Sequence, residues 1–234
     1  MFNPTLYQIL ISSTESDGVK TAVTALCALL CIALPYLLGS VNFALVISKC
    51  FYRDDIRKHG SGNAGMTNML RTYGKAAAGA TLLCDMLKAT ASVFFGAFVY
   101  GINGGYIAGL FCIMGHIFPI FFKFKGGKGV ATTAAMILTL DPLCFLILLI
   151  LFMILVAGTK YVSLGSVICM MLYPILTYKL ASWGYHGFPV LISFMVAALV
   201  IFMHRDNIKR LLNHTENKIS FSKKKRNQNH GDKK

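Results

Sequence analysis

The chain has 234 residues, of which 56% are hydrophobic and 14% charged, and its formal net charge is +14. This length suits a single domain, but the composition is too apolar for an ordinary soluble domain and indicates an integral membrane protein. The seven cysteines lie in or beside apolar stretches without a CxxC pair, and no histidines cluster at metal-ligand spacing. We therefore expect cysteines that pack in the interior, and neither a metal site nor a cofactor.

Apolar runs predict the membrane spans. Five runs are long enough, or nearly so, to cross about 30 Å of hydrocarbon as a helix. They cover residues 21–48, 76–100, 105–122, 162–180 and 187–203. The stretch 129–159 could form one long helix or two short helices broken at Asp141-Pro142, because proline disfavours continuation. Only two helices place every basic loop on one side, so we predict an all-α integral membrane protein with about seven transmembrane helices.

The distribution of lysine and arginine predicts the orientation. Twenty of the 23 fall in residues 49–75, in residues 123–128, at Lys160, and from Arg205 onward. Excess cations in short loops mark the cytoplasmic side, which predicts an outside N-terminus and a cytoplasmic C-terminus. We expect residues 1–218 to form one membrane domain. Residues 219–234 resemble a basic disordered cytoplasmic tail, suited to anionic lipid or acidic partners rather than nucleic acid.

The first polar loop reads DIRKHGSGNAGMTNMLRTYGK over residues 55–75. Its glycines can adopt positive φ and bring N–H groups together around an anion, its hydroxyl and amide side chains add hydrogen bonds, and its arginines are forked phosphate donors. A flexible loop with glycine turns is the alternative. The candidate phosphate-binding residues here are Arg57, Gly60, Ser61, Gly62, Asn63, Gly65, Thr67, Asn68 and Arg71.

The second polar loop reads GHIFPIFFKFKGGKGVATT over residues 115–133. Its Gly-Gly-Lys-Gly turn precedes a predicted helix N-terminus, where the helix dipole and free N–H groups favour anions. We expect Lys125, Gly126, Gly127 and Lys128 to bind phosphate. A cationic cluster that only orients the protein in the membrane is the alternative. The Walker pattern is absent, so no nucleotide is predicted.

Two further segments, 160–166 and 204–210, should reach the same side and contribute Ser163 and Ser166 to the site. His204 at a helix end is commonly an interface residue, but with Asn207 on the same helical face it is a candidate ligand. Asp85 and Lys88 lie three residues apart within an apolar span and can pair on one helix face, so a structural and a catalytic role both stay open.

At these loops the sequence resembles the bacterial acyl-phosphate:glycerol-3-phosphate acyltransferases, the PlsY family. The matching motifs are Gly39-Ser40, DIR-x-x-GSGN-x-G-x-TN-x-x-R-x-x-GK, Asp85-x-x-Lys88, GH-x-FP-x-F-x-x-FKGGKGVAT, Ser-Leu-x-Ser, HR-x-NI-x-RLL and Glu216-x-Lys218. Met66, Asn42, Ala44 and His214 depart from the residues usual in the family, but none of these changes removes a hydrogen-bonding group.

The family is described as seven-helix membrane enzymes that move a fatty acyl group from acyl phosphate to the 1-hydroxyl of glycerol 3-phosphate, giving lysophosphatidic acid and phosphate. The resemblance implies a bacterial inner or plasma membrane location, no cofactor, a lipid-facing slot for the acyl chain and a soluble acyl-phosphate synthase as partner. It implies a structural role for Glu216. The catalytic residues that it implies are Ser40, Arg57, Lys128, His204 and Asn207, with Ser163 helping to position glycerol 3-phosphate.

No dedicated histidine base is evident, because none of the six histidines has an aspartate five positions later. We hypothesise that a substrate phosphate oxygen accepts the hydroxyl proton. The alternative function is a membrane transporter of a phosphorylated small solute, which would also need cationic loops. A transporter should spread polar groups through both halves of the membrane, whereas Lys179 is the only cation in the predicted outer loops.

Overall fold

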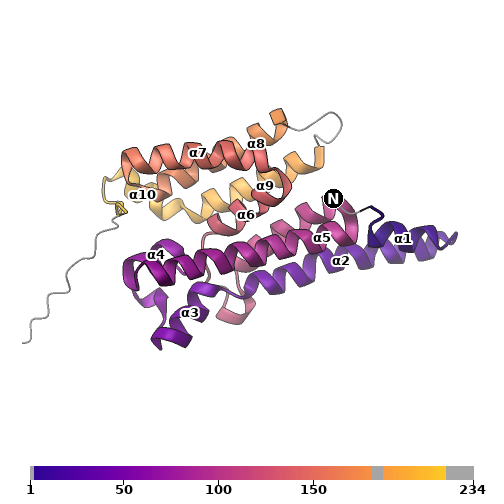
Figure 1. Ribbon diagram of the computed structural model, residues 1–234, viewed down its shortest axis with the longest axis horizontal. Helices are drawn as coiled ribbons and strands as arrows, with labels where there is room; N and C mark the ends of the chain where they lie inside the picture. The colour runs from indigo at the N-terminus through magenta and orange to yellow at the C-terminus, as the bar shows by residue number, and fades with distance from the viewer. Residues whose placement is uncertain (1–2, 181–186, 220–234) are drawn as a thin grey trace, which may run out of the picture.

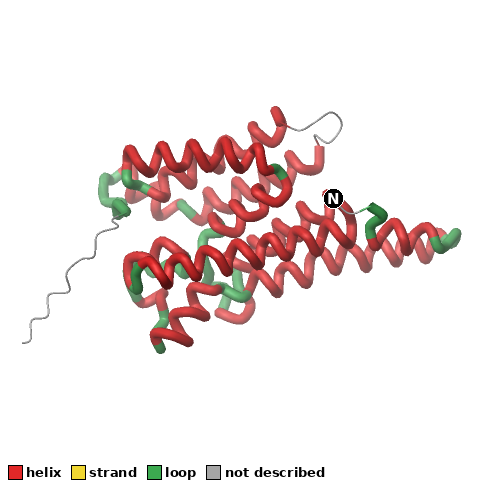
Figure 2. Tube along the Cα trace, viewed as in Figure 1, coloured by secondary structure: helices red, strands yellow, loops and turns green. Residues whose placement is uncertain are grey.

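The computed structural model describes residues 3–180 and 187–219, and this part of the chain contains helices and no β-strand (Figures 1 and 2). The prediction of an all-α protein is confirmed. The α-helices are α1 (Leu6–Ser12), α2 (Asp17–Ser40), α3 (Phe43–Tyr52), α4 (Met66–Thr72), α5 (Lys75–Ile117), α6 (Val130–Leu140), α7 (Pro142–Thr159), α8 (Val162–Leu180), α9 (Gly187–Met203) and α10 (Arg205–Leu212). Two short 3-10 helices are η1 (Ile56–Lys58) and η2 (Ile120–Phe122).

Four helical stretches of the described chain are long and apolar enough to cross a membrane. A fifth is added if α9 and α10, which meet at a bend of 57°, form one span. Helix α6 is apolar but has only 11 residues. The count of seven transmembrane helices therefore stays a prediction. The four stretches are Asp17–Tyr52, Lys75–Phe122, Pro142–Thr159 and Val162–Leu180.

Helix α5 is a hairpin of two arms. Tyr100 and Gly101 interrupt it with non-helical backbone angles, and Gly101 has a φ of 68°. A Cβ built on Gly96 would lie 2.2 Å from the carbonyl oxygen of Gly104, whereas residues eight apart in a continuous helix are separated by about 12 Å. The chain therefore reverses at this point, in agreement with the separate runs expected at 76–100 and 105–122.

Two helix breaks bear on the predicted spans. Helix α6 ends at Leu140 and α7 begins at Pro142, where the Asp141 carboxylate accepts a hydrogen bond of 3.0 Å from the backbone N–H of Cys144, so the predicted break is confirmed. The single run expected over 21–48 is wrong, because α2 ends at Ser40. Asn42 then caps the separate helix α3, since its side-chain oxygen accepts a hydrogen bond of 3.1 Å from the N–H of Leu45.

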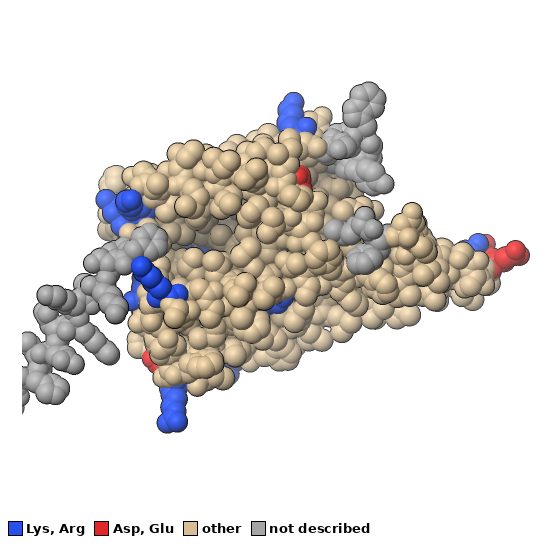
Figure 3. All heavy atoms as spheres, in the orientation of Figure 1, with Lys and Arg blue, Asp and Glu red and all other residues tan. Residues whose placement is uncertain are grey.

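The helices form two groups that enclose a common core. Helix α2 packs along α5, while α7, α8 and α9 pack together, and α6 lies between α5 and α7 (Figure 1). The core joins both groups through buried apolar side chains such as Val93, Ile113, Met136 and Val196. Most Lys and Arg side chains visible in Figure 3 gather at the end of the molecule where α4 and α10 lie. This grouping agrees with the basic loops sharing one side.

Candidate active site

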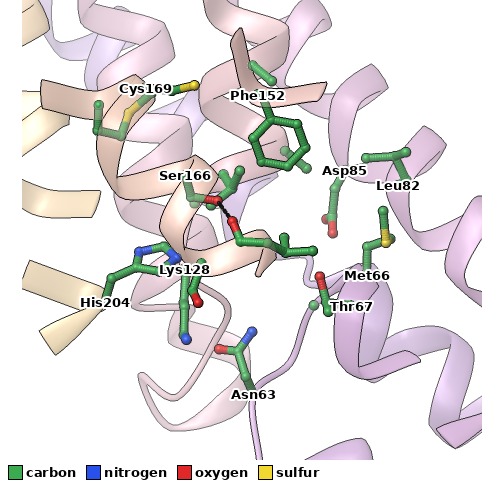
Figure 4. A pocket seen from close by; sticks show the side chains of 18 of the residues that line it. Asn63, Met66, Thr67, Leu82, Asp85, Lys128, Phe152, Ser166, Cys169 and His204 are labelled. Atoms are coloured by element: carbon green, nitrogen blue, oxygen red, sulfur yellow. Dashed lines mark hydrogen bonds between the residues drawn. The ribbon is translucent and has the colours of Figure 1, made fainter. Parts of the chain in front are cut away.

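A cavity of about 340 Å³ lies between the two helix groups (Figure 4). Its polar lining comes from the two glycine-rich loops, from the start of α8 and from the segment around α10. These residues are Ser61, Asn63, Gly65, Thr67, Asn68, Arg71, Lys128, Ser163, Ser166, His204, Asn207, Glu216 and Asn217, and helix α5 adds Asp85 and His116. Its apolar wall comes from α5, α6, α7 and α8 and includes Leu82, Met86, Ile137, Leu148, Phe152 and Met170.

A chain of hydrogen bonds joins the polar residues. The Lys128 ammonium donates to the Asn207 amide oxygen, and the Asn207 amide nitrogen donates to Glu216 Oε1 at 2.7 Å. The same carboxylate accepts from Ser163 Oγ at 3.0 Å and from Arg210 Nε at 2.7 Å. Burial alone would raise the pKa of Glu216, but its three donors outweigh burial and hold the pKa below its usual value. Glu216 thus anchors three segments as a carboxylate.

The cavity mouth is electropositive. Lys128 is partly buried, and this burial, reinforced by the nearby Arg210, lowers the pKa of Lys128 to about 8. Lys128 is therefore mainly cationic at neutral pH. Arg71 also lines the cavity, and its guanidinium donates to the backbone carbonyl of Asn217 at 3.1 Å. Two carboxylates line the cavity, Asp85 and Glu216, and each is paired with a cation, Lys88 and Arg210. The charges of Lys128 and Arg71 therefore leave a net positive charge for an anionic ligand.

His204 lies beside Lys128 in the cavity wall (Figure 4). Its Nδ1 is 2.8 Å from the carbonyl oxygen of Val200, so Nδ1 carries the proton and donates, which leaves Nε2 for another partner. Ser166 Oγ donates to the carbonyl of Val162 at 3.0 Å and keeps its capacity to accept. The four separated segments that the sequence singled out are therefore brought to one cavity.

The first glycine-rich loop is wrapped around the side chain of Asn68. The Asn68 amide oxygen accepts from the N–H of Ser61 at 3.0 Å, and its amide nitrogen donates to three backbone carbonyls of the same loop at 2.9–3.2 Å. Gly60 has a φ of 56°, and a Cβ there would lie 2.1 Å from the Asn68 amide oxygen. Asn68, predicted as a phosphate ligand, therefore shapes the loop that presents Ser61, Asn63 and Thr67.

The second glycine-rich turn is built differently. The N–H groups of Gly126 and Gly127 donate to the carbonyls of Ile117 and His116, both at 3.1 Å, and so close the end of α5. A Cβ on Gly126 would lie 2.0 Å from the carbonyl oxygen of His116. These two glycines, predicted to bind phosphate, are thus used for close backbone packing. Helix α6 begins at Val130 as expected, and its first turn lines the cavity.

Arg57 lies outside the main cavity and links the two loops. Its guanidinium donates to Asp55 Oδ2 at 2.6 Å and to the carbonyls of Phe122 and Lys125 at 3.1 and 3.3 Å. The hydrogen bonds from Arg57 lower the pKa of Asp55 to about 2. A second cavity, of about 470 Å³, is open here. It is lined by Asp55, Arg57, Lys58, Gly62, Lys123, Lys125 and Gly126.

Ser40 also lies outside the main cavity. It is fully buried, its hydroxyl donates to the carbonyl of Tyr36 at 2.9 Å, and the same oxygen accepts from the N–H of Ile120 at 3.3 Å. The structure thus gives Ser40 a joining role between α2 and η2.

The expected ion pair of Asp85 and Lys88 is present, with 2.8 Å between Asp85 Oδ1 and Lys88 Nζ. Sequence reasoning missed three partners of the site: His116, Arg210 and Asn217. The motif GH-x-FP contained His116, but its contact with Lys88 depends on the α5 hairpin and has no local signal. Among the described residues, no group of three or more His, Cys, Asp or Glu side chains is placed to hold a metal ion.

Comparisons with known proteins agree with this architecture. A family model described as glycerol-3-phosphate acyltransferase matches residues 29–214. The chain is 43% identical over 185 residues to the glycerol-3-phosphate acyltransferase of Finegoldia magna, covering 79% of this chain and 92% of the relative. It is 41% identical over 192 residues to the glycerol-3-phosphate acyltransferase of Thermoanaerobacter pseudethanolicus, covering 82% of this chain and 96% of the relative.

Solved structures are also similar. The crystal structure of PlsY, an integral membrane glycerol 3-phosphate acyltransferase, in its glycerol 3-phosphate form superposes with a TM-score of 0.77 at 33% identity, covering 82% of this chain and 96% of that chain. The lysophosphatidic acid form of PlsY gives a TM-score of 0.75 at 32% identity, covering 83% and 96%.

Proposed function

Because the chain belongs to the glycerol-3-phosphate acyltransferase family, we propose that it transfers a fatty acyl group from acyl phosphate to the 1-hydroxyl of glycerol 3-phosphate, giving lysophosphatidic acid and inorganic phosphate. The observation that carries this proposal is a single cavity that joins a cationic polar end to an apolar wall. The two ends match the two parts of the product, a phosphate headgroup and an acyl chain.

The polar end supplies the groups that would hold glycerol 3-phosphate. Lys128 and Arg71 offer positive charge to its phosphate, and Asn207 is held in one orientation because its amide nitrogen already donates to Glu216. Ser163, Ser166 and His204 add hydrogen-bonding groups around the same space. The acyl chain would lie against the apolar wall of α5, α6, α7 and α8, which excludes water from the reacting carbonyl.

The proposed step needs little acid or base chemistry from the protein. The hydroxyl oxygen of glycerol 3-phosphate attacks the acyl carbonyl carbon, and the bond between that carbon and the phosphate oxygen breaks. Phosphate leaves with the electron pair, and a substrate phosphate oxygen accepts the hydroxyl proton. The protein's task is to orient the two substrates and to stabilise developing negative charge with cations and N–H donors.

The second cavity is the proposed location for additional phosphate contacts. Arg57 and Lys125 face it, with Gly60 and Gly62 in the loop beside it. Arg57 also ties the first loop to the carbonyls of Phe122 and Lys125. A phosphate bound to Arg57 would therefore contact the point where the two loops are joined. We keep Ser40 as a candidate catalytic residue. Its hydroxyl accepts from the N–H of Ile120 in η2, which precedes the second glycine-rich turn.

We assign the enzyme to the bacterial inner or plasma membrane, with the N-terminus outside and the C-terminus cytoplasmic. The concentration of cationic side chains at the end holding α4 and α10 supports this orientation. A soluble acyl-phosphate synthase at the cytoplasmic face would supply the donor. Of the predicted tail, residues 219–234, only Ile219 is described, and its N–H donates to the carbonyl of Lys160 at 2.8 Å. The rest of the predicted tail lies outside the described residues. The comparisons give no support to the alternative of a phosphorylated-solute transporter.

The test is an assay of the purified full chain in lipid vesicles. Palmitoyl phosphate is supplied with and without glycerol 3-phosphate, palmitoyl-coenzyme A serves as the control donor, and inorganic phosphate and lysophosphatidic acid are measured. We expect phosphate release that requires glycerol 3-phosphate and falls strongly in Lys128→Ala. Folded protein that releases no phosphate, or that uses only palmitoyl-coenzyme A, would refute the proposed reaction.

A further inference from the structure

A buried charge cluster is formed by Asp85, Lys88 and His116. Asp85 (Figure 4) and His116 line the cavity, but the cluster has no part in the proposed step. The three side chains have exposed fractions of at most 4%. Lys88 Nζ lies 2.8 Å from Asp85 Oδ1 and 3.2 Å from His116 Nδ1, and His116 Nδ1 lies 3.4 Å from the same carboxylate oxygen. Because apolar replacement of a buried ion pair is often neutral or stabilising, the contacts that this cluster makes with other segments need explanation.

Lys88 fixes the break between α2 and α3. Its ammonium donates to the carbonyls of Gly39 at 2.9 Å and Val41 at 2.6 Å, on either side of Ser40. Carbonyls at the end of a helix lack intrahelical donors, so a cation there satisfies them. The same break reaches the first glycine-rich loop, because the side-chain amide of Asn42 donates to the carbonyl of Ala64 at 3.2 Å.

His116 is the contact with the second glycine-rich turn. Its carbonyl accepts from the N–H of Gly127 at 3.1 Å. A Cβ on Gly127 would lie 2.1 Å from His116 Nε2 and 2.8 Å from the carbonyl oxygen of Ala64. The imidazole is therefore held by Asp85 and Lys88 at one edge and touches the turn at the other. The next residue in that turn is Lys128.

We infer that Asp85, Lys88 and His116 are positioning residues that hold the two glycine-rich loops and the α2–α3 break in register around the cavity. The cluster contacts two of these segments directly, through Val41 and Gly127. The first glycine-rich loop joins them through Ala64, whose carbonyl accepts from Asn42 and lies against Gly127. This inference rests on the proposed function, since it concerns how tightly and in what orientation glycerol 3-phosphate is held. A cluster with a purely structural role would tie α2 to α5 and leave substrate affinity unchanged.

The test is a double variant, Asp85→Asn with Lys88→Met, which removes both charges and leaves neither buried and unpaired. Removing only Asp85 or only Lys88 would leave a buried unpaired charge, which is strongly destabilising, so single variants of this ion pair are not informative. The matched control is Asp17→Asn with Lys20→Met, a pair with the same three-residue spacing whose charges lie 3.8 Å apart on an exposed helix end. Each protein is assayed in lipid vesicles for kcat, for the KM of glycerol 3-phosphate and for thermal unfolding.

We expect the double variant to fold but to unfold at a lower temperature, because the carbonyls of Gly39 and Val41 lose the Lys88 donor. We also expect it to lose roughly 10- to 100-fold in kcat/KM, mainly through KM, because the loops are misplaced by a fraction of an ångström. The control should match the wild type. A folded double variant with wild-type kcat and KM would overturn the positioning role. An inactive wild-type protein would instead refute the proposed function.

A second variant decides the question if the double variant does not fold. His116→Phe keeps a ring against Gly127 and keeps the backbone carbonyl that accepts from Gly127, but it loses the nitrogen that faces Asp85 and Lys88. We expect a raised KM for glycerol 3-phosphate with little change in thermal unfolding, and recovery toward the wild-type KM in His116→Gln, whose amide can hydrogen-bond to Asp85. An unchanged KM in folded His116→Phe would overturn the inference.

Discussion

The two glycine-rich loops have similar composition but use glycine in different ways. In the first loop, Gly60 and Gly62 have positive φ and let the backbone curl around the side chain of Asn68. In the second, Gly126 and Gly127 have no such angle, and glycine is required there because the backbone packs against His116. Of the glycines in this turn, only Gly129, which caps the start of α6, has a positive φ, of 83°. Glycine in such a motif can be required either for its backbone angle or for close packing. Which of the two applies depends on contacts with residues distant in the sequence.

The largest expected effect concerns the second turn. In Gly127→Ala the added methyl group would meet His116 Nε2 at 2.1 Å and the Ala64 carbonyl at 2.8 Å. We expect overpacking to cost about 1–3 kcal/mol of stability or more, and displacement of Lys128 to cost about 100-fold in kcat/KM. Thermal unfolding in detergent and vesicle assays measure both. The control is Gly158→Ala in α7, where nothing lies within 4 Å, and wild-type behaviour of Gly127→Ala would contradict the packing argument.

The next effect concerns the first loop. Asn68→Ala removes the side chain that satisfies four backbone groups of the loop, so we expect a loss of about 1–3 kcal/mol and a clear rise in the KM of glycerol 3-phosphate. Asn68→Asp keeps the acceptor for the Ser61 N–H but loses the donors, so its stability should fall by at least as much as that of Asn68→Ala. If Asn68→Ala lowered kcat while leaving stability unchanged, Asn68 would be a substrate ligand rather than the centre of the loop.

The pH dependence sharpens the comparison at Lys128. Burial lowers the pKa of Lys128 to about 8, so its cationic form is present below pH 8 and is lost as the pH rises through that value. We expect kcat/KM for glycerol 3-phosphate to fall above pH 8, by about tenfold per pH unit. In Lys128→Arg, whose charge persists, the fall should move to higher pH. A wild-type profile that stays flat to pH 9.5 would remove Lys128 from substrate binding.

The smallest effect is expected at Lys125. Its side chain is exposed at the rim of the second cavity, outside the main one, and exposed charges contribute about 1 kcal/mol or less. Lys125→Gln should change kcat/KM by less than about fivefold, with an effect that shrinks as ionic strength rises. A loss comparable to that of Lys128→Ala at high salt would show that the second cavity holds a reacting phosphate.

Local sequence predicted much of the fold, but not the break after Ser40. Apolar runs gave most helices, and Asp141-Pro142 marked the break between α6 and α7, because a capping carboxylate and a proline act on adjacent residues. The break before α3 lies in a run without a charged residue, where Ser40 and Asn42 are isolated polar residues. It is stabilised by Lys88, 47 residues from Val41, and a contact at that separation leaves no periodic signal.

The sequence by itself determined the membrane class, the resemblance to a family of acyltransferases and the segments that carry polar site residues, because composition, span length and motif order are properties of the chain. The tertiary structure decided which residues share the cavity. It placed Lys128, Ser163, His204 and Asn207 there, and it placed Ser40 and Arg57 outside it. The physical reason is the hairpin of α5, whose reversal at Gly101 brings His116 to Lys88 and with it both glycine-rich loops to one buried cluster.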